Sequence, residues 1–197
     1  MFRSLYELHA FNGDPHPGNY LFHRGGRVTF LDFGLVRHFT PAELAPLANM
    51  ARYVAVEHDP EAFRRNLEQA GFLRPDAPLS TGEVVEYMAV FYDSVRESRP
   101  VTMTGDYSSA VVRRFFDVRS PVTTYARIPR SYVILQRINL GLFGLLGELT
   151  ATANWRAIAE EIWPFVLGPP STPIGEAEAA GWARQARQKA LPPLTLD

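Results

Sequence analysis

Residues 11–34 read FNGDPHPGNYLFHRGGRVTFLDFG, and this stretch decides the fold. Its first nine residues are rich in glycine, proline, aspartate and asparagine, a composition typical of a loop. Two short apolar runs follow, at 20–23 and 28–31, with the sequence RGGR between them. A Gly-Gly pair between two such runs predicts a β-hairpin, because both glycines can adopt positive φ.

This hairpin would bring two oxygen-bearing side chains together. If Gly25 and Gly26 form the whole loop, Asn19 lies directly opposite Asp32. Opposed Cβ atoms in a hairpin are about 4.5–5.5 Å apart. Mg²⁺ prefers oxygen ligands and is often held by one or two protein groups together with substrate phosphates. We therefore predict that Asn19 and Asp32 are the metal ligands and, through the metal, the cofactor-binding residues.

A second carboxylate, Asp14, is expected to face the same place. The prolines of its loop restrict the backbone, and Gly13 and Gly18 allow sharp turns or close approach. Such a carboxylate can orient an attacking hydroxyl group and accept its proton during phosphoryl transfer. Asp14 is the predicted catalytic residue.

The rest of the sequence is typical of helices. Thr40 and Glu43 have the spacing of a capping box, and Asp59 is a suitable cap for a second helix that Gly71 can end. Further helices are expected at 2–10, 81–98, 107–117, 130–149, 154–167 and 175–190.

These elements indicate an α+β fold that is predominantly α-helical. We expect one domain over residues 1–167, with a catalytic loop at 11–19 and a hairpin at 20–32. A linker at 168–174 would lead to a short helix and tail at 175–197.

Composition narrows the functional classes. The net charge of −1 offers no case for nucleic-acid binding, and the absence of cysteine excludes disulfides and thiolate metal sites. The most apolar long stretch, 132–149, is interrupted by polar residues and is expected to be a buried helix. The N-terminus has no apolar signal core. We expect a cytoplasmic location, with peripheral membrane association left open.

The order of these residues matches that of protein kinases. Asp14 and Asn19 come first, a hairpin follows, and Asp32-Phe33-Gly34 comes last, as in the catalytic loop and metal-binding motif of those enzymes. The stretches 11–19 and 31–34 resemble the UbiB/AarF (ADCK) atypical kinases, and residues 137–142 and 151–155 also resemble their C-terminal part.

The resemblance implies that the fold is a protein-kinase-like C-lobe whose hairpin carries the metal site. It implies that Asp14 is the catalytic-loop aspartate and that Asn19 and Asp32 bind Mg²⁺. ATP would be the nucleotide, and the activity would be a phosphotransferase or ATPase linked to quinone or lipid metabolism. The acceptor would be a small molecule or a lipid.

The sequence departs from a complete kinase at its N-terminal side. An N-lobe normally supplies a phosphate-covering loop and a lysine for the nucleotide. Only 13 residues precede Asp14, and Lys189 is the only lysine. We therefore expect a C-lobe without an N-lobe, inactive alone, with an N-lobe-bearing chain or a membrane surface as possible partners.

Other interpretations remain open. A non-catalytic pseudokinase scaffold would expose an apolar patch beside the hairpin, where an N-lobe would otherwise sit. An aminoglycoside- or choline-type phosphotransferase would use a similar Gly-Asp-x-x-x-x-Asn loop. A histidine metal cluster is a further alternative, because four histidines fall within the first 38 residues: His9, His16, His23 and His38.

Overall fold

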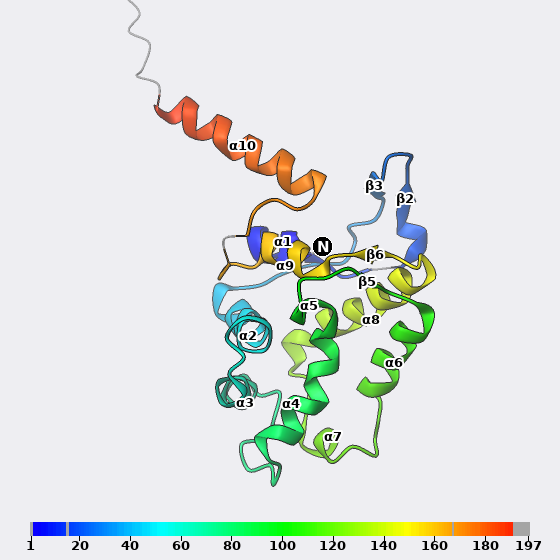
Figure 1. The fold of residues 1–197 in the computed structure, drawn as a ribbon, viewed down its shortest axis with the longest axis vertical. Helices are drawn as coiled ribbons and strands as arrows, with labels where there is room; N and C mark the ends of the chain where they lie inside the picture. Colours follow the sequence, from blue (N-terminus) through cyan, green and yellow to red (C-terminus); the bar gives the residue numbers. More distant parts are fainter. Residues whose placement is uncertain (1, 15, 167, 191–197) are drawn as a thin grey trace, which may run out of the picture.

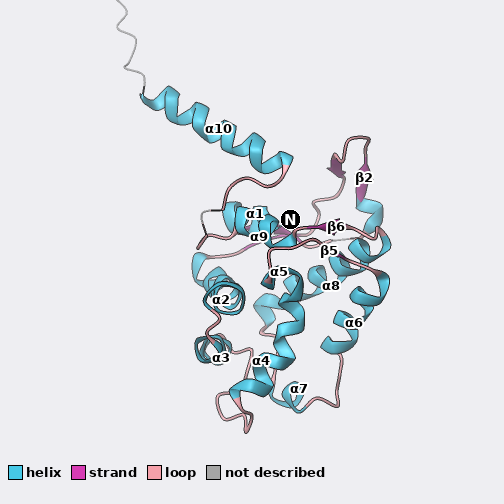
Figure 2. Cartoon of the chain, in the orientation of Figure 1, coloured by secondary structure: helices cyan, strands magenta, loops and turns pink. Residues whose placement is uncertain are grey.

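The computed structural model describes residues 2–14, 16–166 and 168–190. Figure 2 shows that helices make up most of the chain, as expected for a predominantly helical α+β protein. Within the described residues, the strands pair in three two-stranded antiparallel sheets. The β2–β3 hairpin and helix α10 both project from one end of a helical body (Figure 1).

The N-terminal segment contains the short strands and the hairpin. Its elements are α1 (Phe2–Leu8), β1 (Ala10–Asn12), the 3₁₀ turn η1 (Pro17–Asn19), β2 (Tyr20–Phe22), β3 (Val28–Phe30) and β4 (Val36–His38). Strand β1 pairs with β4, so that Phe11 lies opposite Arg37 and Asn12 opposite Val36. This pairing brings the chain before the hairpin beside the chain after it.

The hairpin forms where the sequence predicts it, but its register is different. Gly25 and Gly26 both have positive φ, at 80° and 77°. The backbone N–H of His23 donates to the carbonyl of Arg27 at 2.9 Å, so Arg24 joins the two glycines in a three-residue loop. Tyr20 accordingly pairs with Phe30.

This extra loop residue overturns the predicted pairing of Asn19 with Asp32. The residue that meets Asn19 is Leu31, whose N–H donates to the Asn19 carbonyl at 2.9 Å. A shift of one residue turns each side chain to the other face of a strand pair. The hairpin register alone therefore does not bring the amide of Asn19 and the carboxylate of Asp32 together.

The first two helices of the body begin where the sequence predicts them, and the second also ends as predicted. Helix α2 (Pro41–Ala51) starts with a capping box in which Thr40 Oγ1 accepts from the Glu43 N–H and the Glu43 carboxylate accepts from the Thr40 N–H. A π-helical segment, η2 (Arg52–Glu57), follows it. Asp59 caps α3 (Pro60–Gln69), and Gly71 at φ +76° follows its end.

The remaining elements are α4 (Thr81–Ala89), η3 (Val90–Tyr92), α5 (Asp93–Arg96), β5 (Val101–Thr102), α6 (Gly105–Phe115), α7 (Pro121–Tyr125), η4 (Arg130–Tyr132), α8 (Val133–Glu148), β6 (Thr152–Ala153), α9 (Trp155–Ile162) and α10 (Pro173–Ala190). The helix expected over 81–98 is divided into three segments, and the one expected over 154–167 ends at Ile162. The expected tail at 191–197 lies outside the described residues.

A buried apolar cluster holds the N-terminal segment against the helical body. Phe11 of β1, Leu44 of α2 and Ile138 of α8 are buried members of this cluster. The Tyr132 hydroxyl donates to the Glu43 carbonyl at 2.9 Å and joins the start of α8 to α2. Strand β1, and with it the loop that follows, is therefore fixed on the core. None of the helices in the described ranges is both long and apolar enough to span a bilayer.

Helix α10 is attached to the body through Arg3 and through the residues just before the helix, where the N–H and hydroxyl groups of Ser171 and Thr172 donate to Glu161 of α9. The Arg3 guanidinium of α1 pairs with Glu161 of α9 and with Glu178 of α10, and it also contacts Glu7 at 3.1 Å. Burial and the neighbouring Glu178 raise the pKa of Glu7. Beyond this attachment the helix extends away from the domain, with Ile174 and Trp182 exposed (Figure 1).

The capping carboxylate of α4 provides a test of the fold by titration. The Ser80 hydroxyl and N–H donate to Glu83 and hold the pKa of that carboxyl below its ordinary value. A lowered pKa in the folded protein means that the cap contributes stability above the ordinary glutamate pKa of about 4.3. This contribution is lost as the pH falls through the lower pKa of the folded state.

We predict that the Glu83 carboxyl, followed by ¹³C NMR, titrates below the ordinary glutamate pKa of about 4.3. Ser80→Ala should move the Glu83 titration toward the ordinary value. If the Glu83 carboxyl had the same pKa in the wild type and in Ser80→Ala, the proposed capping interaction would be contradicted.

Candidate active site

The loop after β1 is closed by its own backbone and by His16. The His16 Nδ1 atom accepts from the Gly18 N–H at 3.1 Å, and the His16 carbonyl accepts from the Asn19 N–H at 2.9 Å. These bonds form the 3₁₀ turn Pro17–Asn19. Because the turn is closed on itself, the position of Asn19 relative to the start of the loop is fixed.

Asp14 and Asn19 are in direct contact. The Asn19 Nδ2 atom donates to Asp14 Oδ2 at 2.8 Å, and both residues are half-buried. Tyr20 is buried beside them, and its burial and the Asp14 charge together raise the pKa of its phenol. The amide of Asn19 therefore orients the Asp14 carboxylate, while Asp14 Oδ1 accepts no hydrogen bond from the described residues.

Asn12 links this loop to the Asp32-Phe33-Gly34 segment. Its Oδ1 atom accepts from the Asp14 N–H at 3.3 Å, and its Nδ2 atom donates to the Asp32 carbonyl at 2.7 Å. A carboxamide can do both because it carries a donor and an acceptor. The sequence reasoning missed this residue, although its place just before Gly13-Asp14 was a usable signal.

Gly13 allows the close packing on which the loop depends. Its N–H donates to the Leu35 carbonyl at 2.5 Å, extending the contact between β1 and β4. A Cβ atom built on Gly13 would lie 2.5 Å from Ile134 Cδ1 and 3.0 Å from the Leu35 carbonyl oxygen. Any larger residue would push the loop away from α8 or from the segment after Asp32.

Asp32 is held by a local turn. Its Oδ1 atom accepts from the Gly34 N–H at 2.6 Å, an arrangement common for aspartate in turns. No direct hydrogen bond joins its carboxylate to Asp14 or Asn19 among the described residues. The structure thus brings Asp14 and Asn19 together and connects the backbone of Asp32 to them through Asn12.

Two side-chain oxygen atoms of this site that accept no hydrogen bond from the described residues are of the type that binds a hard cation. Asn19 Oδ1 and Asp32 Oδ2 make no hydrogen bond to the described residues, and amide and carboxylate oxygens are the ligands that Mg²⁺ prefers. In the part of the chain that the structure describes, no group of three or more His, Asp or Glu residues could hold a metal, so the histidine-cluster alternative has no support.

An exposed apolar surface lies beside the site, as expected if another part of a protein covers it. We call it the hairpin apolar surface. Phe33 is 62% exposed and Phe22 56% exposed. The full set comprises Leu21, Phe22, Val28, Phe30, Leu31, Phe33, Leu35 and Val36. These residues lie on the hairpin and on the segment that follows it as far as β4, and exposed apolar patches are typical of interaction surfaces.

Comparison with known proteins connects this site to a family. Residues 1–66 match the ABC1 atypical kinase-like domain. Two chloroplastic relatives come from Arabidopsis thaliana. An aarF domain-containing protein kinase is 30% identical over 161 residues, which is 79% of this chain and 22% of that protein. ACTIVITY OF BC1 COMPLEX KINASE 3 is 32% identical over 144 residues, which is 70% of this chain and 19% of that protein.

A protein of Synechocystis, sll0005, is 31% identical over 145 residues, which is 71% of this chain and 20% of that protein. The chain thus spans about a fifth of the length of these relatives.

A solved structure shares the fold. Rv3197 of Mycobacterium tuberculosis, determined in complex with erythromycin, superposes with a TM-score of 0.61 at 23% identity. The match covers 83% of this chain and 40% of Rv3197. The loop and turn at Asp14, Asn19 and Asp32 fall within the matched residues 1–66. The sequence matches and the shared fold are consistent with each other. The chain belongs to the ABC1 (UbiB/AarF) family of atypical kinase-like proteins.

Proposed function

We propose that this chain is the catalytic-loop-bearing C-lobe, over residues 1–167, of an ATP- and Mg²⁺-dependent phosphotransferase or ATPase. The observation that carries the proposal is the hydrogen bond from Asn19 Nδ2 to Asp14 Oδ2, in a loop that Asn12 connects to Asp32. This contact gives the Asp14 carboxylate one fixed orientation. Fixed orientation is the main requirement of phosphoryl transfer, where the protein contributes chiefly positioning and charge stabilisation.

In this proposal Asp14 acts on the attacking group. Its Oδ1 atom, which has no described hydrogen-bond partner, would accept the proton of an acceptor hydroxyl or of water as the new P–O bond forms. Asn19 Oδ1 and Asp32 Oδ2 would hold Mg²⁺. When bound, Mg²⁺ neutralises charge on the β- and γ-phosphates of ATP. Asn12 positions both halves of the site without touching the reacting atoms.

The segment after Asp32 favours a small molecule, a lipid or water as the acceptor. In protein kinases a long activation loop at this place helps to dock a protein substrate. Here the chain instead enters β4, which pairs with β1, and α2 begins at Pro41. The family resemblance points to quinone or lipid metabolism, and a lipid acceptor would bring the protein to a membrane surface.

The hairpin apolar surface supports the proposal that another segment must cover the site. Kinase-like proteins place an N-lobe above the catalytic loop, and it supplies the lysine and the loop that bind the nucleotide phosphates. We propose that the remainder of a longer protein, or a separate N-lobe-bearing chain, packs on this surface.

A catalytic role of Asp14 is tested in a protein that includes an N-lobe. We expect Asp14→Asn to lower the ATP turnover number by about 10²- to 10⁴-fold, because it removes the proton acceptor. ATP binding should be nearly unchanged. Asp32→Ala should also weaken Mg²⁺-dependent ATP binding, measured by calorimetry. Asp106→Asn, at an exposed position on α6, is the matched control. Equal turnover in the wild type and Asp14→Asn would refute the role.

The positioning role of Asn12 gives a separate prediction. Asn12→Ala removes the links to the Asp14 N–H and the Asp32 carbonyl. Because a lost hydrogen bond costs about 1 kcal/mol or more, we expect the turnover number to fall by about tenfold, with a smaller change in the KM for ATP. Asn49→Ala, at a half-buried position on α2, is the control. A change confined to unfolding free energy would show that Asn12 is only structural.

A second candidate function is a non-catalytic scaffold, and the exposure of the hairpin apolar surface favours it. In that case the surface would bind a partner, and the site would not need to bind a nucleotide. Calorimetry with ATP and Mg²⁺, on a protein that includes an N-lobe, separates the two functions. A scaffold should bind ATP very weakly or not at all, whereas micromolar affinity would exclude it.

A further inference from the structure

A cavity lies far from the candidate active site. It is formed by α4, the end of α6 and the start of α7, at the opposite end of the body from the β2–β3 hairpin (Figure 1). Its volume is about 290 Å³. Since one water occupies about 30 Å³ in the liquid, the cavity has room for about ten waters, or for a molecule the size of an amino acid.

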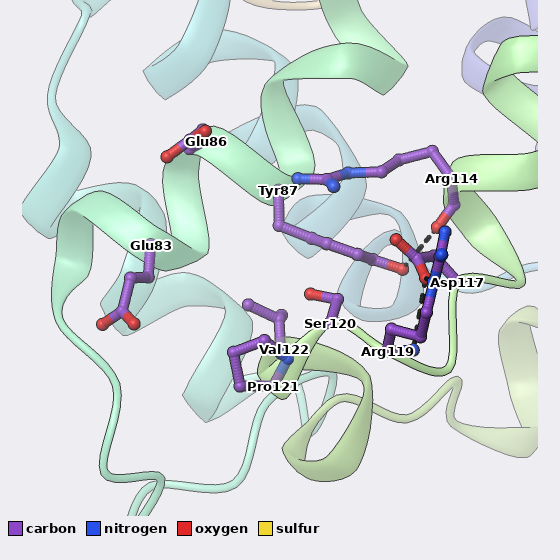
Figure 3. Close-up of a pocket in the computed structure, with 9 residues that line it drawn as sticks. All are labelled: Glu83, Glu86, Tyr87, Arg114, Asp117, Arg119, Ser120, Pro121 and Val122. Carbon is purple, nitrogen blue, oxygen red and sulfur yellow. Dashed lines mark hydrogen bonds and ion pairs between the residues drawn. The ribbon is translucent and has the colours of Figure 1, made fainter.

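Tyr87 and Arg114 form its fixed inner part. The Tyr87 hydroxyl donates to the Arg114 carbonyl at 2.9 Å, which fixes the ring against the end of α6. The Arg114 guanidinium lies over that ring, 4.6 Å from its centroid, and the two side chains run side by side in Figure 3. Because the ring packs against one face of the guanidinium, the N–H groups at its edge remain to bind a ligand.

Two of the carboxylates around the cavity are already engaged. Glu83 accepts from the N–H and hydroxyl of Ser80, and Asp117 accepts from the Arg119 N–H and Nε. These bonds keep the pKa values of both carboxyls below their ordinary range. Both are therefore ionised at neutral pH, and Arg119 balances the charge of Asp117.

Three groups at the cavity remain without a partner among the described residues. Ser120 is only 9% exposed, yet its hydroxyl makes no hydrogen bond and does not cap α7. Arg114 Nε is buried and lacks an acceptor. Glu86 is exposed and has no cation beside it. Figure 3 shows the Ser120 hydroxyl pointing into the space between Tyr87 and Val122.

The groups without a partner come from different sides of the cavity: Glu86 from α4, and Arg114 and Ser120 from the side where Asp117 is already paired with Arg119. Arg114 and Ser120 offer donors, which suit a carboxylate, because guanidinium groups match carboxylate geometry. Glu86, with Glu83 one turn away on the same helix, offers negative charge on the α4 side. A ligand that supplies acceptors to the guanidinium N–H groups of Arg114 and to the Ser120 hydroxyl would therefore be favoured.

We propose that this cavity binds a small zwitterion of the amino-acid class, with its carboxylate toward Arg114 and Ser120 and its ammonium group toward Glu86. A dianion such as phosphate fits less well, because Glu83, Glu86 and Asp117 all surround the cavity. A simple cation would leave Arg114 and Ser120 without acceptors.

The test is a titration of the 197-residue chain by ¹⁵N NMR with glycine, β-alanine and γ-aminobutyrate. Acetate, inorganic phosphate and methylammonium serve as probes that carry charge of one sign only. We expect at least one zwitterion to shift the amide signals of Glu86, Ser120 and Val122 in a saturable way, and each of the three probes to bind at least about fivefold more weakly, as expected when one ion pair is lost.

Two variants locate the ligand. Glu86→Gln should weaken zwitterion binding by about fivefold while leaving acetate binding unchanged. Ser120→Ala should weaken both, and because Ser120 makes no capping bond the fold should be preserved. Glu61→Gln and Ser109→Ala, at exposed positions on α3 and α6, are the matched controls.

Five results would overturn the proposal. The first two are the absence of any saturable shift and equal binding of the zwitterions and acetate or phosphate. The next two are preferential binding of methylammonium and zwitterion binding that Glu86→Gln leaves unchanged. The fifth is preferential binding of phosphate, which would identify an anion site instead. None of these measurements depends on phosphotransferase activity, so the proposal stands or fails independently of the proposed function.

Discussion

The two hydrogen bonds of the Asn12 side chain are the constraint on which the candidate active site depends. The residues that they join are the start of the catalytic loop and the turn after the hairpin, which are separated by the whole of β2 and β3. The β1–β4 pairing provides the frame, since it fixes the backbone on both sides of these segments. Without this frame the loop and the turn would be two independent surface segments, and their side chains would have no fixed relation.

Packing extends this constraint into the core. Phe11, next to Asn12, is almost completely buried, and the cluster around it includes Ile138 of α8. Gly13 then passes so close to Ile134 that there is no room for a side chain. The polar site therefore rests on an apolar base, because alternate residues of β1 face the core and the site. The candidate site lies on a loop, and the rigidity of this loop comes from the helix beneath it.

The features that the sequence predicted well are those determined over three or four residues. The capping box of α2 and the turn glycines Gly25 and Gly26 depend only on near neighbours, and they appear where expected. The predicted hairpin register was wrong. The register depends on whether Arg24 belongs to a strand or to the loop, and the pattern of apolar residues does not distinguish these two possibilities. The helix expected over 81–98 is interrupted at Val90–Tyr92, although the apolar pattern continues through the break.

The contact between the two loop residues of the candidate site could be predicted from the sequence, whereas their connection to Asp32 could not. Asp14 and Asn19 share one short loop, so their contact follows from local chain direction. The connection of this pair to Asp32 is made by the side chain of Asn12, which is 20 residues before Asp32 in the sequence. A contact over such a separation leaves no periodic pattern in the sequence. The sequence therefore supplied the chemical groups, and the tertiary structure supplied Asn12 as the connection between them.

The single arginine that receives carboxylates from α1, α9 and α10 has a consequence for the ends of the protein. Because Arg3 contacts both Glu161 and Glu178, the first and last helices of the described chain share one cation. Groups that share a partner do not contribute independently to stability. Detachment of α10 would leave Arg3 to the other carboxylates and alter the local charge balance of α1, which leads directly into β1. A change at the far end of the polypeptide would thus be thermodynamically coupled to the segment that carries the catalytic loop.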